Sequence, residues 1–221
     1  MTNEFLFIFL SLFSLSLVLL AFLAGRVWLI SLIAVNAVLL NIFVTKGIYI
    51  FGMATTGGNI LYASIFFATD LLGEHYGKKD ATKAVMVGFF ASLFFLAASQ
   101  SILMFSPADY DIAHQSLEKI FSFVPRIVFG SMIAYLISQN LDVWLFLKIK
   151  YFTKGKYLWL RNNASTMISQ LVDSIIFTLI AFLGVYPNIW QFILFTYIIK
   201  IIVSAIDTPF IYLSKILKPK N

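Results

Sequence analysis

The chain has 221 residues, of which 61% are hydrophobic and 12% are charged, and its mean hydropathy is +0.92. A soluble domain of this length cannot bury so large a share of apolar residues, so the composition indicates an integral membrane protein. The net charge of +6 does not indicate a nucleic-acid partner, because the basic residues fall at the ends of apolar runs. The sequence contains no cysteine, which excludes disulfides and thiol chemistry.

Seven apolar stretches are long enough to cross a bilayer core of roughly 30 Å, which takes about 20 helical residues each. Polar and apolar residues do not alternate in them, as they would in the strands of a membrane barrel, so the stretches predict an all-α, polytopic helix bundle. The stretches cover residues 5–24, 27–45, 57–74, 82–104, 124–147, 163–184 and 190–213. The first has Glu4 and no basic residue at its start, and it lacks a small-x-small cleavage pattern, so we expect a retained helix and not a signal peptide.

The basic residues predict the orientation of the chain. Alternate loops place twelve of them on one side: Arg26, Lys78, Lys79, Lys83, Lys148, Lys150, Lys154, Lys156, Arg161, Lys215, Lys218 and Lys220. The other side holds only Lys46, Lys119 and Arg126. Because basic loops stay in the cytoplasm, the N-terminus is expected outside and the C-terminus inside.

Two connecting segments are irregular. Residues 45–59 mix Gly, Thr and a short apolar run, and they form either a re-entrant or unwound stretch that enters the third span or an ordinary external loop. Residues 105–123 contain Pro107 and several acids and predict a longer external loop that carries a short surface helix. No soluble domain is expected, so the whole chain, 1–221, is predicted to form a single transmembrane domain.

Charged residues inside spans are costly and usually face a cavity or a partner. In this sequence they are Asp70, Glu74, Asp142, Asp173, Lys200 and Asp207. A helical rise of roughly 1.5 Å per residue places Asp173 and Lys200 about 15 Å deep on consecutive antiparallel helices. We therefore expect these two residues to pair or to share a substrate, with a purely structural ion pair as the alternative.

Other polar residues follow these charges at helical spacing. The three stripes are Ser131, Tyr135, Gln139 and Asp142; Asn163, Thr166, Gln170 and Asp173; and Tyr197, Lys200, Ser204 and Asp207. The stretch "SQNLD" at 138–142 is echoed by "SQLVD" at 169–173, which is either a trace of internal duplication or a coincidence.

The motifs of common enzymes are missing from the sequence, which has no GxSxG, HExxH or Walker A pattern. We therefore expect no enzyme activity, catalytic residue, metal or cofactor. Carboxylates and carboxamides one turn apart can bind both polar edges of an aromatic heterocycle, and aromatic side chains can stack on its faces. The stripes predict a midplane site for a planar, purine-like solute, as a transporter needs.

Four blocks of the sequence resemble the queuosine precursor transporter family, also called the vitamin uptake transporter family. They are "TDLLGEHYGKKDA" (69–81), "PRIVFGSMIAYLISQNLDVWLF" (125–146), "LWLRNNASTMISQLVDSIIFTLIAF" (158–182) and "YIIKIIVSAIDTPFIYL" (197–213). The first block resembles the family's Asp-x-x-x-Glu-x-Tyr-Gly-Lys signature. The resemblance implies a multi-pass protein of the bacterial inner membrane that imports 7-deazaguanine bases, such as 7-cyano-7-deazaguanine and 7-aminomethyl-7-deazaguanine, as a secondary transporter. It also implies a core of six helices over 27–213, with 5–24 as an additional helix.

The family's signature positions correspond to Asp70, Glu74, Arg126, Gln139, Asp142, Arg161, Asn162, Gln170, Asp173, Lys200 and Asp207. For the guanine-like edge of a substrate the first candidate is Asp173 with Gln170, and the second is Asp142 with Gln139. Lys200, Asn163, Asp207 and Tyr135 complete the expected substrate site. Asp70 and Glu74, with Arg161 and Arg126, are candidates for an inner gate or a proton relay, with a helix end fixed by salt bridges as the alternative.

Two other roles remain open at this level. One is a substrate-binding subunit of an uptake complex energised by a separate ATPase. The other is a membrane scaffold in which Asp173 and Lys200 are purely structural. The expected partners are the small solute and the lipid bilayer, with no nucleic acid, and the sequence leaves open whether copies assemble into a homo-oligomer.

Overall fold

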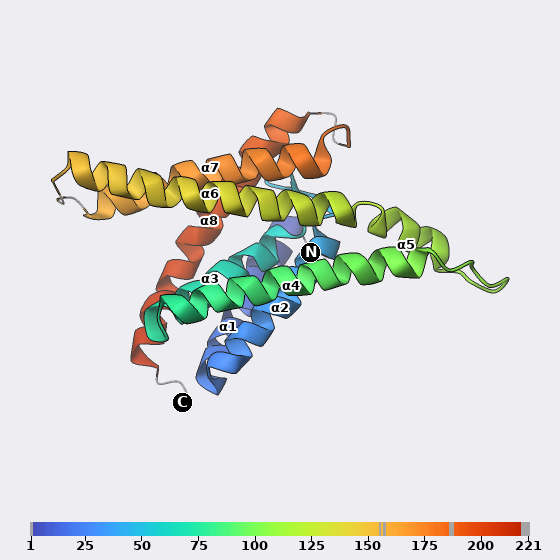
Figure 1. Ribbon diagram of the computed structural model, residues 1–221, viewed down its shortest axis with the longest axis horizontal. Helices are drawn as coiled ribbons and strands as arrows, with labels where there is room; N and C mark the ends of the chain where they lie inside the picture. The colour runs from blue at the N-terminus through green and yellow to red at the C-terminus, as the bar shows by residue number, and fades with distance from the viewer. Residues whose placement is uncertain (1, 155, 157, 186–187, 218–221) are drawn as a thin grey trace. The chain divides into compact units, whose positions relative to one another are not determined.

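The computed structural model describes residues 2–154, 156, 158–185 and 188–217 (Figure 1). Within these ranges the description excludes the side chains of residues 78, 143, 146, 150, 158–163, 203–208 and 211. The helices are α1 (Asn3–Ala24), α2 (Arg26–Phe43), α3 (Asn59–His75), α4 (Lys78–Leu103), α5 (His114–Phe121), α6 (Val124–Phe152), α7 (Leu158–Phe182) and α8 (Ile189–Ile216). All the predicted apolar stretches correspond to helices, with ends that differ by a few residues.

The described helices confirm a helical membrane bundle. Five helical segments are long and apolar enough to cross a membrane: Asn3–Ala24, Arg26–Phe43, Lys79–Leu103, His114–Ile149, which runs from α5 into α6, and Ala164–Phe182. A shorter apolar helix covers Ile189–Ile202 within the described part of α8. The predicted count of seven spans, and the side on which each terminus lies, stay predictions.

The chain divides into two compact units. Unit 1 comprises Met1–Pro125 and Ile202–Asn221, and unit 2 comprises Arg126–Ile201. The chain therefore passes from one unit to the other at the start of α6 and again within α8. The expectation of a single transmembrane domain stays a prediction.

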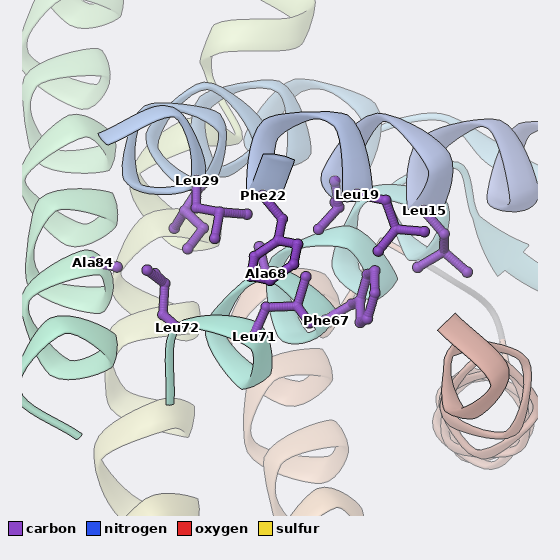
Figure 2. Close-up of a cluster of buried hydrophobic side chains, with 11 residues drawn as sticks. Leu15, Leu19, Phe22, Leu29, Phe67, Ala68, Leu71, Leu72 and Ala84 are labelled. Carbon is purple, nitrogen blue, oxygen red and sulfur yellow. The ribbon is translucent and has the colours of Figure 1, made fainter. Parts of the chain in front are cut away.

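The core of unit 1 is built around α1 and α3. Its buried side chains are Leu15, Val18, Leu19 and Phe22 of α1, Leu29 and Ile33 of α2, Phe67, Ala68, Leu71 and Leu72 of α3, and Ala84 of α4. Figure 2 shows the α1 side chains pointing onto α3. Their spacing of three and four residues places them on one helical face. The additional N-terminal helix is therefore an integral part of this core.

Residues 45–59 form an element that the sequence did not predict. Strand β1 (Gly47–Ile50) pairs antiparallel with β2 (Met53–Thr56), and the turn between them has positive φ at Phe51 and Gly52. The Glu4 carboxylate accepts a hydrogen bond of 2.9 Å from the Phe51 N–H, which ties the hairpin to the start of α1. The strand ladder satisfies backbone groups that an unwound stretch would expose.

The connection between α4 and α6 carries the predicted surface helix, α5. The Asp111 carboxylate accepts hydrogen bonds from the N–H groups of Ala113 and His114, at 2.7 and 3.1 Å, at the start of this helix. At its other end the Gln100 side chain donates to the Phe121 carbonyl at 2.9 Å. These contacts hold α5 against the end of α4.

Candidate functional site

Unit 2 contains a buried ion pair between α7 and α8. The Lys200 Nζ lies 2.6 Å from Asp173 Oδ2, and the exposed fractions of the two side chains are 7% and 15%. The prediction that these residues pair is confirmed. Equal depth on antiparallel helices brings them together, and the pairing removes the cost of two isolated charges in an apolar environment.

Two serines connect α6 to α7 at the same acids. Ser138 Oγ on α6 donates to Asp173 Oδ1 at 3.3 Å, and Ser169 Oγ on α7 donates to Asp142 Oδ1 at 3.2 Å. Both serines are buried. Figure 1 shows α6 and α7 running side by side, as these contacts require. Asp142, Asp173 and Lys200 thus belong to one polar network across α6, α7 and α8.

Neither serine is among the predicted functional residues. Isolated serines in apolar helices are common packing residues, and Ser138 and Ser169 lie outside the three predicted stripes. The available signal was the shared Ser-Gln-x-x-Asp pattern at 138–142 and 169–173. In the structure each serine of that pattern bonds to the aspartate of the other copy.

The remaining predicted substrate residues differ in burial, and the side chains of some of them are not described. Gln170 and Tyr135 are half-buried, and Gln139 is exposed. Tyr197, which extends the stripe of α8, donates its hydroxyl to the Met167 carbonyl at 3.2 Å. The side chains of Arg161, Asn162, Asn163 and Asp207 lie outside the described residues.

Arg126 contacts the end of α7. Its Nε donates to the Ile180 carbonyl at 3.1 Å, and its Nη2 donates to the Leu183 carbonyl at 2.9 Å. These are carbonyls that a helix C-terminus leaves without intrahelical partners, and a cation there also complements the helix dipole. The geometry is that of a C-terminal cap, and the gate role of Arg126 stays a prediction.

The acids of the first family block belong to unit 1. Glu74 pairs with Lys215 of α8 at 3.3 Å, with 53% of each side chain exposed, and His75 Nε2 lies 3.0 Å from Ser214 Oγ. The end of α3 is therefore attached to the end of α8. Asp70, one turn earlier on α3, is exposed.

Tyr76 follows α3 and lies at the start of the connection to α4. Its ring makes an edge contact with Phe22, at 6.5 Å between centroids. Burial raises the pKa of the Tyr76 hydroxyl, and the Arg26 charge opposes that shift. The tyrosine of the family signature thus packs against α1 and stays protonated at neutral pH.

A metal site is not indicated by the described residues. No three His, Cys, Asp or Glu side chains in that part of the chain lie together in a way that could hold an ion. The functional groups of the polar network in unit 2 are carboxylates, hydroxyls and the ammonium group of Lys200. These groups can form hydrogen bonds with a polar solute.

Comparison with known proteins gives consistent matches. Residues 56–214 match the family described as "Putative vitamin uptake transporter". A Bacillus subtilis protein named "Probable queuosine precursor transporter" is 44% identical over 89% of this chain and 87% of its own length. The Escherichia coli protein named "Queuosine precursor transporter" is 30% identical over 64% of this chain and 62% of its own length.

A Haemophilus influenzae protein, also named "Probable queuosine precursor transporter", is 30% identical over 60% of this chain and 54% of its own length. No solved structure matches the chain. The family match covers well over half of the residues and includes the whole polar network of unit 2. The chain belongs to the vitamin uptake transporter family.

Proposed function

We propose that this protein imports queuosine precursors, which are 7-deazaguanine bases, across the bacterial inner membrane as a secondary transporter. The names of its relatives in three bacteria support this substrate class. The observation that carries the proposal is the network of Asp142, Asp173 and Lys200 within apolar helices, in which Lys200 is buried and Asp142 is half-buried. Charges at this depth are expensive and mark solute pathways in membrane proteins.

The substrate's chemistry suits these residues. A deazaguanine presents adjacent N–H and amino donors beside a carbonyl, so a carboxylate can accept from the first edge while a carboxamide donates to the carbonyl. The proposed set comprises Asp173, Gln170, Asp142, Gln139, Lys200, Asn163, Asp207 and Tyr135. Lys200 would balance the charge of Asp173 when no substrate is bound.

We also propose seven spans, with the N-terminus outside and the C-terminus in the cytoplasm. The distribution of basic loops supports this orientation. In that arrangement Asp70 and Glu74 lie near the cytoplasmic end of α3, where an inner gate or proton relay would act, with Arg126 and Arg161 as further candidates. The contact between Glu74 and Lys215 supports an ion pair as part of such a gate.

Import can be tested in a bacterial host that neither makes queuosine precursors nor takes them up at nanomolar concentration. The host expresses this chain, receives 7-cyano-7-deazaguanine, and its tRNA is analysed for queuosine. We expect restored modification, and its loss in a double variant that neutralises both network acids, Asp142→Asn with Asp173→Asn. The matched control is Asp80→Asn, which removes an acid paired with Arg26 on unit 1.

Failure of the wild-type protein, when folded and present in the membrane, would contradict import by this polypeptide alone. Restoration only when an energising ATPase is supplied would favour the role of a substrate-binding subunit. Full activity of the double variant would favour a scaffold in which the acids are purely structural.

A further inference from the structure

The stretches 138–142 and 169–173 make reciprocal hydrogen bonds between α6 and α7. In both, a serine precedes an aspartate by four residues, and each serine bonds to the aspartate of the other helix. Each serine hydroxyl also lies near the carbonyl three residues before it, with Ser138 at 3.2 Å from Tyr135 O and Ser169 at 3.0 Å from Thr166 O. The two halves therefore match in sequence, spacing and hydrogen bonding.

Lys200 breaks this symmetry. Asp173 accepts from Ser138 through Oδ1 and binds the Lys200 ammonium through Oδ2, so each of its oxygens has a partner and its negative charge is balanced. Asp142 accepts from Ser169 through Oδ1. Among the described residues no cation pairs with Asp142, which is half-buried. Two acids in matching positions thus differ in their electrostatic state.

We propose that Asp142 is the carboxylate that binds the N–H donor edge of the substrate, and that Asp173 with Lys200 fixes the helices around it. This assignment rests on the proposed function and names the substrate contact within it. A ligand that donates to Asp173 competes with the Lys200 ammonium for the same carboxylate. A ligand that donates to Asp142 meets no such competition within the described residues, where no cation pairs with that acid. This assignment reverses the predicted order of candidates for the guanine-like edge, in which Asp173 came first and Asp142 second.

The surroundings of Asp142 support this assignment. Gln170 follows Ser169 directly and is half-buried, whereas Gln139, at the same position of the pattern on α6, is exposed. The bonded pair of Asp142 and Ser169 therefore has a partly buried carboxamide next to it in sequence. A carboxylate for the donor edge and a carboxamide for the carbonyl are the groups that a guanine-type base requires.

The test measures binding of two bases to the purified full-length protein. One probe is 7-cyano-7-deazaguanine, and the other is the same base without its 2-amino group. We expect the wild-type protein to prefer the first by roughly tenfold or more, which is typical of a hydrogen bond to a charged acceptor. Asp142→Asn should reduce the preference to within about twofold, because a carboxamide cannot accept from both donors.

The two reciprocal serine–aspartate bonds provide matched variants, one on each helix. Asp173→Asn combined with Lys200→Met removes the balanced pair and should weaken the binding of both bases by a similar factor, so that the ratio of the two affinities changes less than in Asp142→Asn. Ser169→Ala should weaken binding of the 2-amino base several-fold, whereas Ser138→Ala should keep the preference and lower the melting temperature. These serine variants keep the test valid even where Asp142→Asn does not fold.

The outcomes are distinguishable. A preference lost in the Asp173 and Lys200 double variant and kept in Asp142→Asn would overturn the assignment. Equal binding of both bases by the wild-type protein would also overturn it, while leaving import of deazaguanines standing. A folded wild-type protein that binds neither base would contradict the proposed function itself.

Discussion

At the scale of single residues, the Asp173–Lys200 pair connects α7 and α8 through two opposite charges. Its 2.6 Å contact is buried within apolar helices, so each charge depends on the other for neutralisation. Ser138 adds a hydrogen bond to the same acid. The attraction within the pair offsets part of the desolvation cost of both charges, and removing one partner takes that compensation from the other.

Neutralising one member of this pair should destabilise the protein by about 3–5 kcal/mol. We expect this loss for Asp173→Asn and for Lys200→Met, and a smaller loss for the double variant, because no unpaired charge then remains. Unfolding of the detergent-solubilised protein measures all three. A double variant as unstable as the two single losses combined would show that the residues do not act as a pair.

At the scale of helices, small residues set how closely neighbours approach. A Cβ at Gly130 of α6 would lie 3.3 Å from Ile180 Cγ2 and 3.4 Å from Ile180 Cβ on α7. A Cβ at Gly88 of α4 would meet Ile33 Cγ2 at 3.5 Å and Ala37 Cβ at 3.7 Å, which is ordinary contact. The two glycines thus occupy helix interfaces of different tightness, and Gly130 lies on the helix pair that carries the serine–aspartate bonds.

Gly130→Ala should destabilise unit 2 by about 1 kcal/mol or more, because overpacking forces α6 and α7 apart. Gly88→Ala is the matched control and should be neutral or stabilising by up to about 1 kcal/mol, since alanine favours helix more than glycine does. Melting temperatures of the two variants compare them directly. A larger loss at Gly88 than at Gly130 would contradict this account of the interfaces.

At the scale of the whole molecule, the chain is a multi-pass protein whose two units are joined at the start of α6 and within α8. The uneven distribution of Lys and Arg between alternate loops predicts which ends of the helices face the cytoplasm. The sequence contains no cysteine, so single introduced cysteines can report that orientation without background labelling.

Ser116→Cys on α5 should react with a membrane-impermeant maleimide in intact spheroplasts. Lys156→Cys, in the loop after α6, should react only after the membrane is permeabilised. Both positions are exposed, so labelling depends on the side of the membrane and not on burial. Labelling of both from the outside would exclude the proposed topology.

The sequence by itself determined the membrane class, the helix positions, the surface helix α5 and the pairing of Asp173 with Lys200. These follow from properties that are local along the chain, since apolar length, helical rise and hydrophobic period do not depend on distant contacts. Equal depth on consecutive antiparallel helices was enough to predict one long-range contact. The resemblance of four blocks to a known family added the substrate class that we propose.

The tertiary structure decided the features that depend on how helices rotate and pack against each other. It placed Ser138 and Ser169 on the opposite acids, assigned Arg126 to the end of α7, and brought α1 into the core of unit 1. It also showed the hairpin at 47–56, whose ladder pairs backbone groups and leaves little trace in side-chain periodicity. Helix rotation is fixed by side-chain packing between segments distant in sequence, so only the folded chain reveals that Asp142 and Asp173 each bond to a serine of the other helix, and that within the described residues Asp173 alone of the two pairs with a cation.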